Sequence, residues 1–139
     1  MEIEQTLMRY GATGFAFASS GPRRRIEFAA HERHVRFELN LPALDDDRFI
    51  GSRDGRQGPS DRVRLERWKA EERRLWRALL LGIKAKLEVV ASGMAIFEEE
   101  FLANIVMPDG RTAGQHAIPA IAKAYQTGRV VGLLPEHTE

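Results

Sequence analysis

The sequence predicts an α+β protein: a three-stranded antiparallel meander packed on a long central helix, with two shorter C-terminal helices. The first observation is an apolar repeat at spacings of three and four across residues 60–92, typical of an amphipathic helix. The second is apolar/polar alternation in three segments between residues 14 and 41, typical of strands covered on one face. At 139 residues, we expect a single domain.

The helix predicted over residues 60–92 is longer than a compact domain can cover. Ser60 suits its N-cap, and Gly93 suits a left-handed residue just past its end. Such a helix spans roughly 48 Å, against a diameter of about 37 Å for a compact chain of this length. We therefore expect it to kink, to protrude or to pair with another chain. Gly82, at its middle, marks a close helix contact or a kink.

Charge fixes the register between the second and third predicted strands. Pairing Glu27 with Arg36 and Arg25 with Glu38 keeps the apolar residues of both strands on one face. This register leaves residues 30–33 as a four-residue loop. The register two residues longer would place Glu27 opposite Glu38, which is unfavourable.

Two further segments precede the long helix. Residues 2–9 are expected to form a short helix that ends at Gly11. Residues 43–59 are polar, rich in glycine and without a period. Because this connection is longer than usual, we expect it to be either mobile or functional.

The first of the two shorter helices is predicted over residues 95–104. Its pattern directs Phe97, Phe101 and Leu102 inward. An apolar run then enters a Pro-Asp-Gly turn within residues 105–111, which predicts a small hairpin.

The last predicted helix begins at a capping box. Thr112 and Gln115 have the required spacing, and the helix is expected to reach Thr127. Pro119 either kinks this helix or is the first-turn residue of a shorter one. Residues 129–139 are expected to form a loosely held tail.

Composition excludes several classes of protein. The chain contains no cysteine, so disulfides, thiolate zinc sites, iron–sulfur clusters and a cysteine nucleophile are excluded. It has no run of 18 apolar residues, and its N-terminus lacks the apolar core of a secretion signal. We therefore expect a cytoplasmic protein without a cofactor and without a membrane partner.

Candidate catalytic groups are few. His31 and His34 flank a polar turn, and a metal site would need a third ligand on a rigid element. His116 has no accompanying nucleophile. The glutamates at 98–100, with Asp109, could hold a divalent cation, but the acidic-x-Lys partner of the common nuclease core is absent. We predict no catalytic residue and no metal site, and rank a metal-dependent hydrolase third among the functional hypotheses.

The basic residues carry the leading functional hypothesis. Residues 21–87 contain 17 Lys and Arg against 11 Asp and Glu, whereas residues 88–139 contain 3 against 7. If the polar face of the sheet is contiguous with the N-terminal half of the long helix, the two form an arginine surface able to follow phosphates. The predicted nucleic-acid-binding residues are Arg23, Arg24, Arg25, Arg36, Arg62, Arg64, Arg67 and Arg74.

Two alternatives stay open. Glu66, Glu71 and Glu72 have the spacing to pair with arginines of the helix, which would leave an ordinary solvated face. The other is a protein-interaction module, for instance an inhibitor of a host complex. Trp68 and Leu65 are its predicted partner interface, with a host protein or a second copy in a homodimer as the partner.

Four segments resemble a family of small proteins from tailed bacteriophages, prophages and related bacterial elements. They are RYGATGF at 9–15, AAHERHVRFELNLP at 29–42, RLWRALLLGIKAKLEVV at 74–90 and FEEEFLANIVMPDGRTAGQHAIPAIAKAY at 97–125. The resemblance implies an intracellular protein of a phage or mobile element in a bacterial host cell. It implies no particular activity and no catalytic residues.

Overall fold

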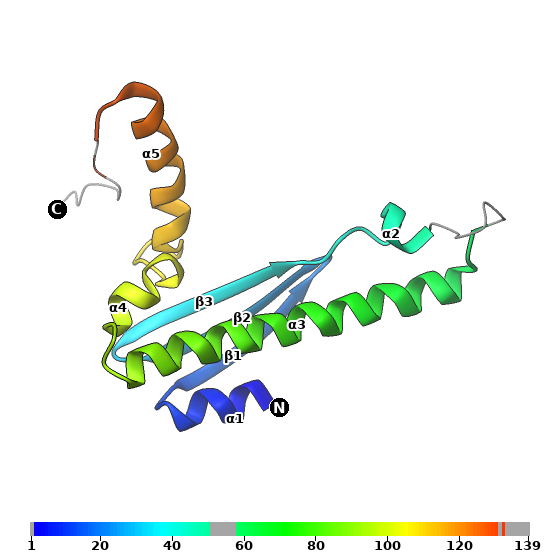
Figure 1. Cartoon of the computed structure of the whole chain (residues 1–139), viewed down its shortest axis with the longest axis horizontal. Helices are drawn as coiled ribbons and strands as arrows, with labels where there is room; N and C mark the ends of the chain where they lie inside the picture. Colours follow the sequence, from blue (N-terminus) through cyan, green and yellow to red (C-terminus); the bar gives the residue numbers. More distant parts are fainter. Residues whose placement is uncertain (1, 51–57, 131, 133–139) are drawn as a thin grey trace.

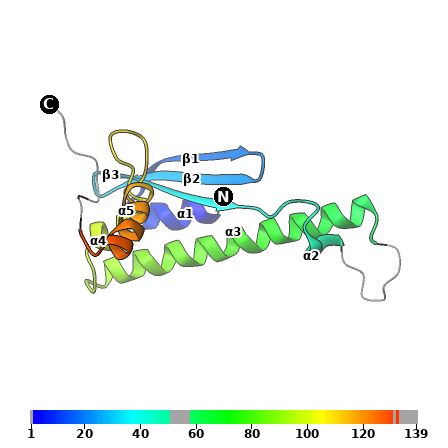
Figure 2. The ribbon, with the colours of Figure 1, turned by 90° about the horizontal axis from the view of Figure 1, so that it is seen from above.

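The computed structural model describes residues 2–50, 58–130 and 132. Three antiparallel strands form one sheet in the order β1-β2-β3: β1 (Thr13–Ser20), β2 (Arg23–Ala30) and β3 (Arg33–Asn40). Helices α1 (Glu2–Arg9) and α3 (Asp61–Ala91) lie on the same side of the sheet (Figures 1 and 2). The α+β architecture is as the sequence predicts.

The predicted register between β2 and β3 is confirmed, but the loop between them is shorter than expected. Glu27 pairs with Arg36 and Arg25 pairs with Glu38. The ladder continues to the pair Ala30 and Arg33, so the turn contains two residues, His31 and Glu32, instead of four. Both adopt left-handed backbone angles, with φ of 50° and 62°, as two-residue hairpin turns of type I′ require. The four-residue prediction was wrong because positive φ is uncommon for residues other than glycine, so His31 and Glu32 give no clear signal of a two-residue turn.

Helix α3 has the predicted caps and protrudes beyond the sheet. The Ser60 hydroxyl accepts from the backbone N–H of Val63, and Gly93 follows the helix with φ of 80°. Its N-terminal half extends past the strands, where the short helix α2 (Asp47–Ile50) lies beside it (Figures 1 and 2). Gly82 marks no close contact, because a Cβ there would meet nothing within 4 Å.

The core lies between the sheet and the C-terminal half of α3. Ile83 and Leu87 are its buried α3 residues. They pack against apolar residues of α1, the strands and the segment that follows α3. Its other members are Leu7, Ala12, Ile26, Phe28, Ala30, Val35, Phe37, Phe97 and Phe101.

The helix predicted over residues 95–104 is divided into two pieces. Helix α4 (Phe97–Glu100) is followed by the 3₁₀ helix η1 (Leu102–Asn104). Phe97 and Phe101 are buried as predicted, whereas Leu102 is 59% exposed. The prediction for Leu102 was wrong because the helix breaks at residue 101 and the tighter 3₁₀ turn places residues differently around its axis. The predicted hairpin is present, with the N–H of Met107 donating to the carbonyl of Arg111.

Helix α5 (Ala113–Thr127) begins with the predicted capping box at Thr112 and ends before Gly128, which has φ of 70°. Pro119 lies inside the helix, so the shorter alternative was wrong. Figure 1 shows α5 projecting away from the sheet. Its first turn is pressed against η1, because a Cβ on Gly114 would lie 2.8 Å from the carbonyl oxygen of Ala103.

The connection predicted over residues 43–59 contains α2, whose Phe49 is buried. Residues 51–57 of this connection lie outside the described residues, as does most of the predicted tail at 129–139. Within the part of the chain that the structure describes, no helix is long and apolar enough to cross a membrane.

Candidate functional site

The eight arginines predicted to contact nucleic acid do not form one surface. Arg25 and Arg36 each neighbour buried residues along their strands, so they point to the face of the sheet opposite α3. The predicted arginines of α3 belong to a helix that packs on the other face of the sheet and extends past the strands (Figure 2). The contiguous surface on which the prediction depended is therefore absent from the described residues.

On the open face of the sheet, Arg25 and Arg36 are bound to carboxylates. Arg25 Nη2 lies 2.8 Å from Glu38 Oε1, and Arg36 Nε donates to Glu27. Burial raises the pKa of Glu27, but hydrogen bonding and charge from Arg36, with His34, outweigh it and leave that pKa below its usual value. This network ties β2 to β3 on the open face of the sheet.

Helix arginines are also largely paired, as the interleaved glutamates allow. Arg64 contacts Asp61, Arg74 contacts Glu71, and Arg62 lies 4.0 Å from Glu66. Arg67 donates to the carbonyl of Phe49 at 3.2 Å. Arg23 is exposed, and no ion pair joins it to a described residue.

Of the two residues of the predicted partner interface, Trp68 makes contacts within the chain and Leu65 is exposed. Trp68 Nε1 donates to the carbonyl of Pro42 at 2.8 Å, and Arg24 covers the indole ring. Leu65, one turn earlier, is 39% exposed. Trp68 therefore anchors the segment after β3 to α3, and only Leu65 is largely available to a partner.

Four basic side chains of α3 have no acidic partner among the described residues. They are separated by four, four and seven positions, so they lie along one side of the helix. All four are exposed. We name them the basic stripe: Lys69, Arg73, Arg77 and Lys84.

The middle of the basic stripe borders a groove between β1 and α3, with a volume of about 780 Å³. We name it the β1–α3 groove. Its large apolar residues are Phe17, Trp76, Leu80 and Leu81. Phe17 pairs directly with Ile26 and so shares the helix-facing side of the sheet, yet it remains 37% exposed.

The charges of this groove are unbalanced. Glu72, the one carboxylate among its described lining residues, lies 2.9 Å from Arg24 and is neutralised by it. Arg73 and Arg77 at the rim have no such partner. The groove therefore combines an apolar floor with a positive rim.

A strand edge runs beside the groove. β1 is an outer strand of the sheet, and no described residue pairs with its outer edge. The other outer strand, β3, is partly covered, because the N–H of Val106 donates to the carbonyl of His34 at 2.8 Å. Of the two sheet edges, β1 is thus the open one.

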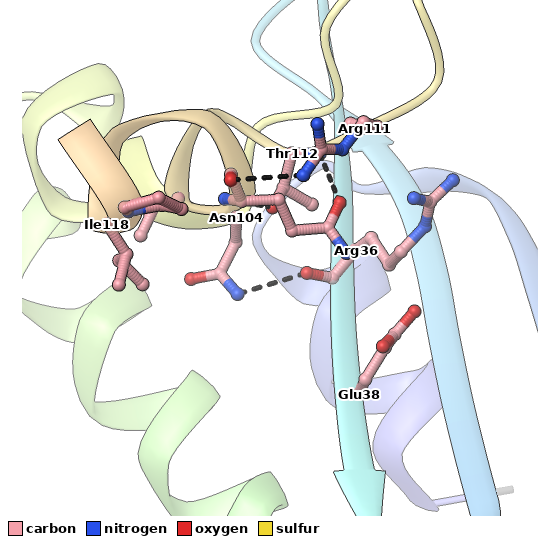
Figure 3. A pocket seen from close by; sticks show the side chains of 10 residues that line it. Arg36, Glu38, Asn104, Arg111, Thr112 and Ile118 are labelled. Carbon is pink, nitrogen blue, oxygen red and sulfur yellow. Dashed lines mark hydrogen bonds between the residues drawn. The ribbon is translucent and has the colours of Figure 1, made fainter. Parts of the chain in front are cut away.

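A second hollow of about 420 Å³ lies between β3 and the start of α5 (Figure 3). Its polar groups mostly bind each other. Arg36 Nη1 donates to the carbonyl of Gly110, Asn104 Nδ2 donates to the carbonyl of Arg36, and Arg111 Nη2 donates to the carbonyl of Gln115. These bonds fasten the C-terminal segment to the sheet, so the hollow is a weaker candidate than the groove.

The histidines considered as ligands or bases have structural contacts. The His31 ring stacks on Phe97 with centroids 4.5 Å apart, and His34 lies 3.2 Å from Glu27. His116 Nε2 lies 2.7 Å from Asp109 Oδ2, at the start of α5.

The glutamates considered as cation ligands are divided among other contacts. Glu98 pairs with Arg33 and Glu100 with Lys86. No three His, Asp or Glu side chains in residues 2–50, 58–130 and 132 are grouped to hold a metal ion. The pairing therefore gives Glu98 and Glu100 a structural role.

Sequence reasoning missed the groove, although part of it was visible. Arg73 and Arg77 have no acidic residue three or four positions away, which distinguishes them from the paired arginines of α3. The contribution of Phe17 required knowledge of which strand lies at the open edge.

No protein-family model matches this chain, and the comparisons with curated proteins and with solved structures likewise find no match.

Proposed function

We propose that this chain acts by binding another protein, with the β1–α3 groove as its binding surface. The observation that carries the proposal is the exposed apolar floor of the groove beside two unpaired arginines. Protein interfaces are enriched in aromatic side chains and arginine. The resemblance to phage and prophage proteins suits an accessory protein of this kind in a bacterial cell.

The groove suits binding better than catalysis. Its described carboxylate, Glu72, is held by Arg24, so it is not free to act as a base. Leu81 is 61% exposed on α3, so a partner that buries its side chain would gain hydrophobic stabilisation of the complex. A partner that covers the floor would also place its own charges near Arg73 and Arg77.

Single-stranded nucleic acid is the second candidate. Phe17 and Trp76 give the groove aromatic side chains close to the basic stripe, the combination on which unpaired bases stack. This moves the nucleic-acid hypothesis from the open face of the sheet to α3. The exposed Leu81 and the open edge of β1 favour protein over nucleic acid.

Photo-cross-linking in the bacterial host separates the two candidates. A photoreactive phenylalanine analogue replaces Leu81 in the groove or, as a matched control, Tyr125, which is exposed on α5. We expect position 81 to give a discrete adduct that resists nuclease and is destroyed by protease, with no such adduct from position 125. An adduct from position 81 that nuclease removes would instead support nucleic acid. Equal adducts from both positions, or none, would contradict the proposal.

A further inference from the structure

We infer that the β1–α3 groove receives an extended, acidic segment of the partner, which adds to the sheet as a fourth strand beside β1. This inference rests on the proposed function of the groove and specifies the chemistry and conformation of its occupant. It follows from the strand edge, the layout of the groove and the sign of its unpaired charges.

The outer edge of β1 supplies the backbone contacts. From Ala16 to Ser20, β1 pairs with β2 one residue to one, so this stretch is regular. An irregularity between Thr13 and Ala16, next to Gly14 with φ of 63°, confines the regular edge to this end of the strand. This regular end also lines the groove through Phe17 and its neighbours. A strand added there would form main-chain hydrogen bonds with β1 and, at the same time, contact the residues of the groove.

The side-chain contacts follow from strand alternation. Every second residue of an added strand would point toward α3, where it meets the apolar floor or the basic stripe. The stripe covers residues 69–84, about 22 Å of helix, which matches six or seven extended residues. Acidic side chains at the rim and apolar ones over Trp76 and Leu81 would satisfy both features.

Charge argues against a second copy of this chain as the occupant. Pairing β1 with β1 across a two-fold axis would continue the sheet and bring two α3 helices onto the same face. The basic stripe lies on the β1 side of α3, since Arg73 and Arg77 line the groove. Two stripes would then face each other, and the carboxylate that lines each groove, Glu72, is already paired with Arg24. An acidic foreign segment removes this repulsion.

The test uses random 12-residue peptides displayed against the immobilised full chain. We expect the enriched peptides to contain acidic residues and apolar residues in alternation. The enriched peptide that binds most tightly, made synthetically, should bind the double variant Arg73→Glu/Arg77→Glu at least tenfold more weakly. The matched control, Lys123→Glu/Arg129→Glu, reverses two exposed charges on and after α5 and should leave binding unchanged.

Backbone methylation then tests the strand geometry. In an added strand, alternate N–H groups face β1 and the others face solvent. Methylating one alternate set of peptide nitrogens should lower affinity at least tenfold, and methylating the other set should leave it within about twofold. A helical peptide would lose binding with either set.

The outcomes separate this inference from the proposed function. The inference would be overturned by enriched peptides that lack acidic residues, or by peptides that lose affinity with both methylation patterns. If the affinity of such peptides still falls with Leu81→Glu in the protein, the groove remains a binding surface. Peptides whose affinity is unchanged by Leu81→Glu in the protein, or no enrichment at all, would overturn both the inference and the proposed function. A homodimer cross-linked through β1 would also overturn the inference.

Discussion

The guanidinium of Arg24 lies over the indole of Trp68, with its Cζ atom 5.8 Å from the ring centroid. The same guanidinium holds Glu72 through a 2.9 Å hydrogen bond. Arg24 is therefore a structural link between β2 and the N-terminal half of α3. Sequence placed it in a nucleic-acid surface, but its side chain is only 12% exposed.

Replacing Arg24 should lower stability. Arg24→Ala leaves Glu72 without its partner and uncovers Trp68, so we expect the free energy of unfolding to fall by about 1–2 kcal/mol. Urea denaturation measures this change. The matched control is Arg23→Ala, because Arg23 is exposed and has no ion pair to a described residue; its effect should stay within about 0.5 kcal/mol. Equal effects of the two variants would contradict the structural role of Arg24.

Two glycines should respond oppositely to the same substitution. Gly114→Ala pushes a methyl group against the carbonyl of Ala103 and should cost about 1–3 kcal/mol. Gly82→Ala adds a methyl group that meets nothing and favours the helix, so it should stabilise by about 0.5–1 kcal/mol. Thermal and urea unfolding of both variants check this. A Gly114→Ala protein as stable as the wild type would contradict the close contact between α5 and η1.

The lowered pKa of Glu27 predicts loss of stability in acid. A carboxyl group whose pKa is lower in the folded state stabilises the fold above its unfolded pKa, and this contribution is lost as pH falls through the folded value. Unfolding free energies at pH 7 and pH 3 should therefore differ less in Glu27→Gln than in the wild type. Glu99→Gln, at an exposed residue without a described ion pair, should behave like the wild type. Identical pH dependence of all three proteins would contradict the network around Glu27.

The hairpin between β2 and β3 should gain stability from glycine. Glu32 has φ of 62°, a conformation that is strained for glutamate and free for glycine. Glu32→Gly should raise the unfolding free energy by about 1 kcal/mol in urea titration. Glu38→Gly, within β3, should instead destabilise the protein, because it removes the partner of Arg25 and loosens a strand. Destabilisation by Glu32→Gly would contradict the two-residue turn.

Elements with a strong local signal were predictable from sequence. The apolar repeat gave α3 with both of its ends, since Ser60 and Gly93 provide cap chemistry. Opposite charges gave the register of β2 and β3, and the box at Thr112 and Gln115 gave the start of α5. In each case the residues that decide the structure lie close together in sequence.

Features that depend on tertiary packing were not predictable. Phe97 and Phe101 turn into the core, and the helix breaks after them, which leaves Leu102 outside. Arg24 looks like its neighbours in a basic run, but strand alternation and the position of α3 bury it. The β1–α3 groove brings together residues 17 and 81, which no local pattern connects.

The measurement that tests the central claim most directly is amide hydrogen exchange of the full chain with and without the cross-linked partner or the selected peptide. The account predicts slowed exchange in residues 16–20 of β1 and residues 72–81 of α3, which line or border the β1–α3 groove, and unchanged exchange in residues 113–127. Slowed exchange confined to α5, where Ile118, Ile121 and Tyr125 are also exposed, would place the binding surface elsewhere and contradict the account.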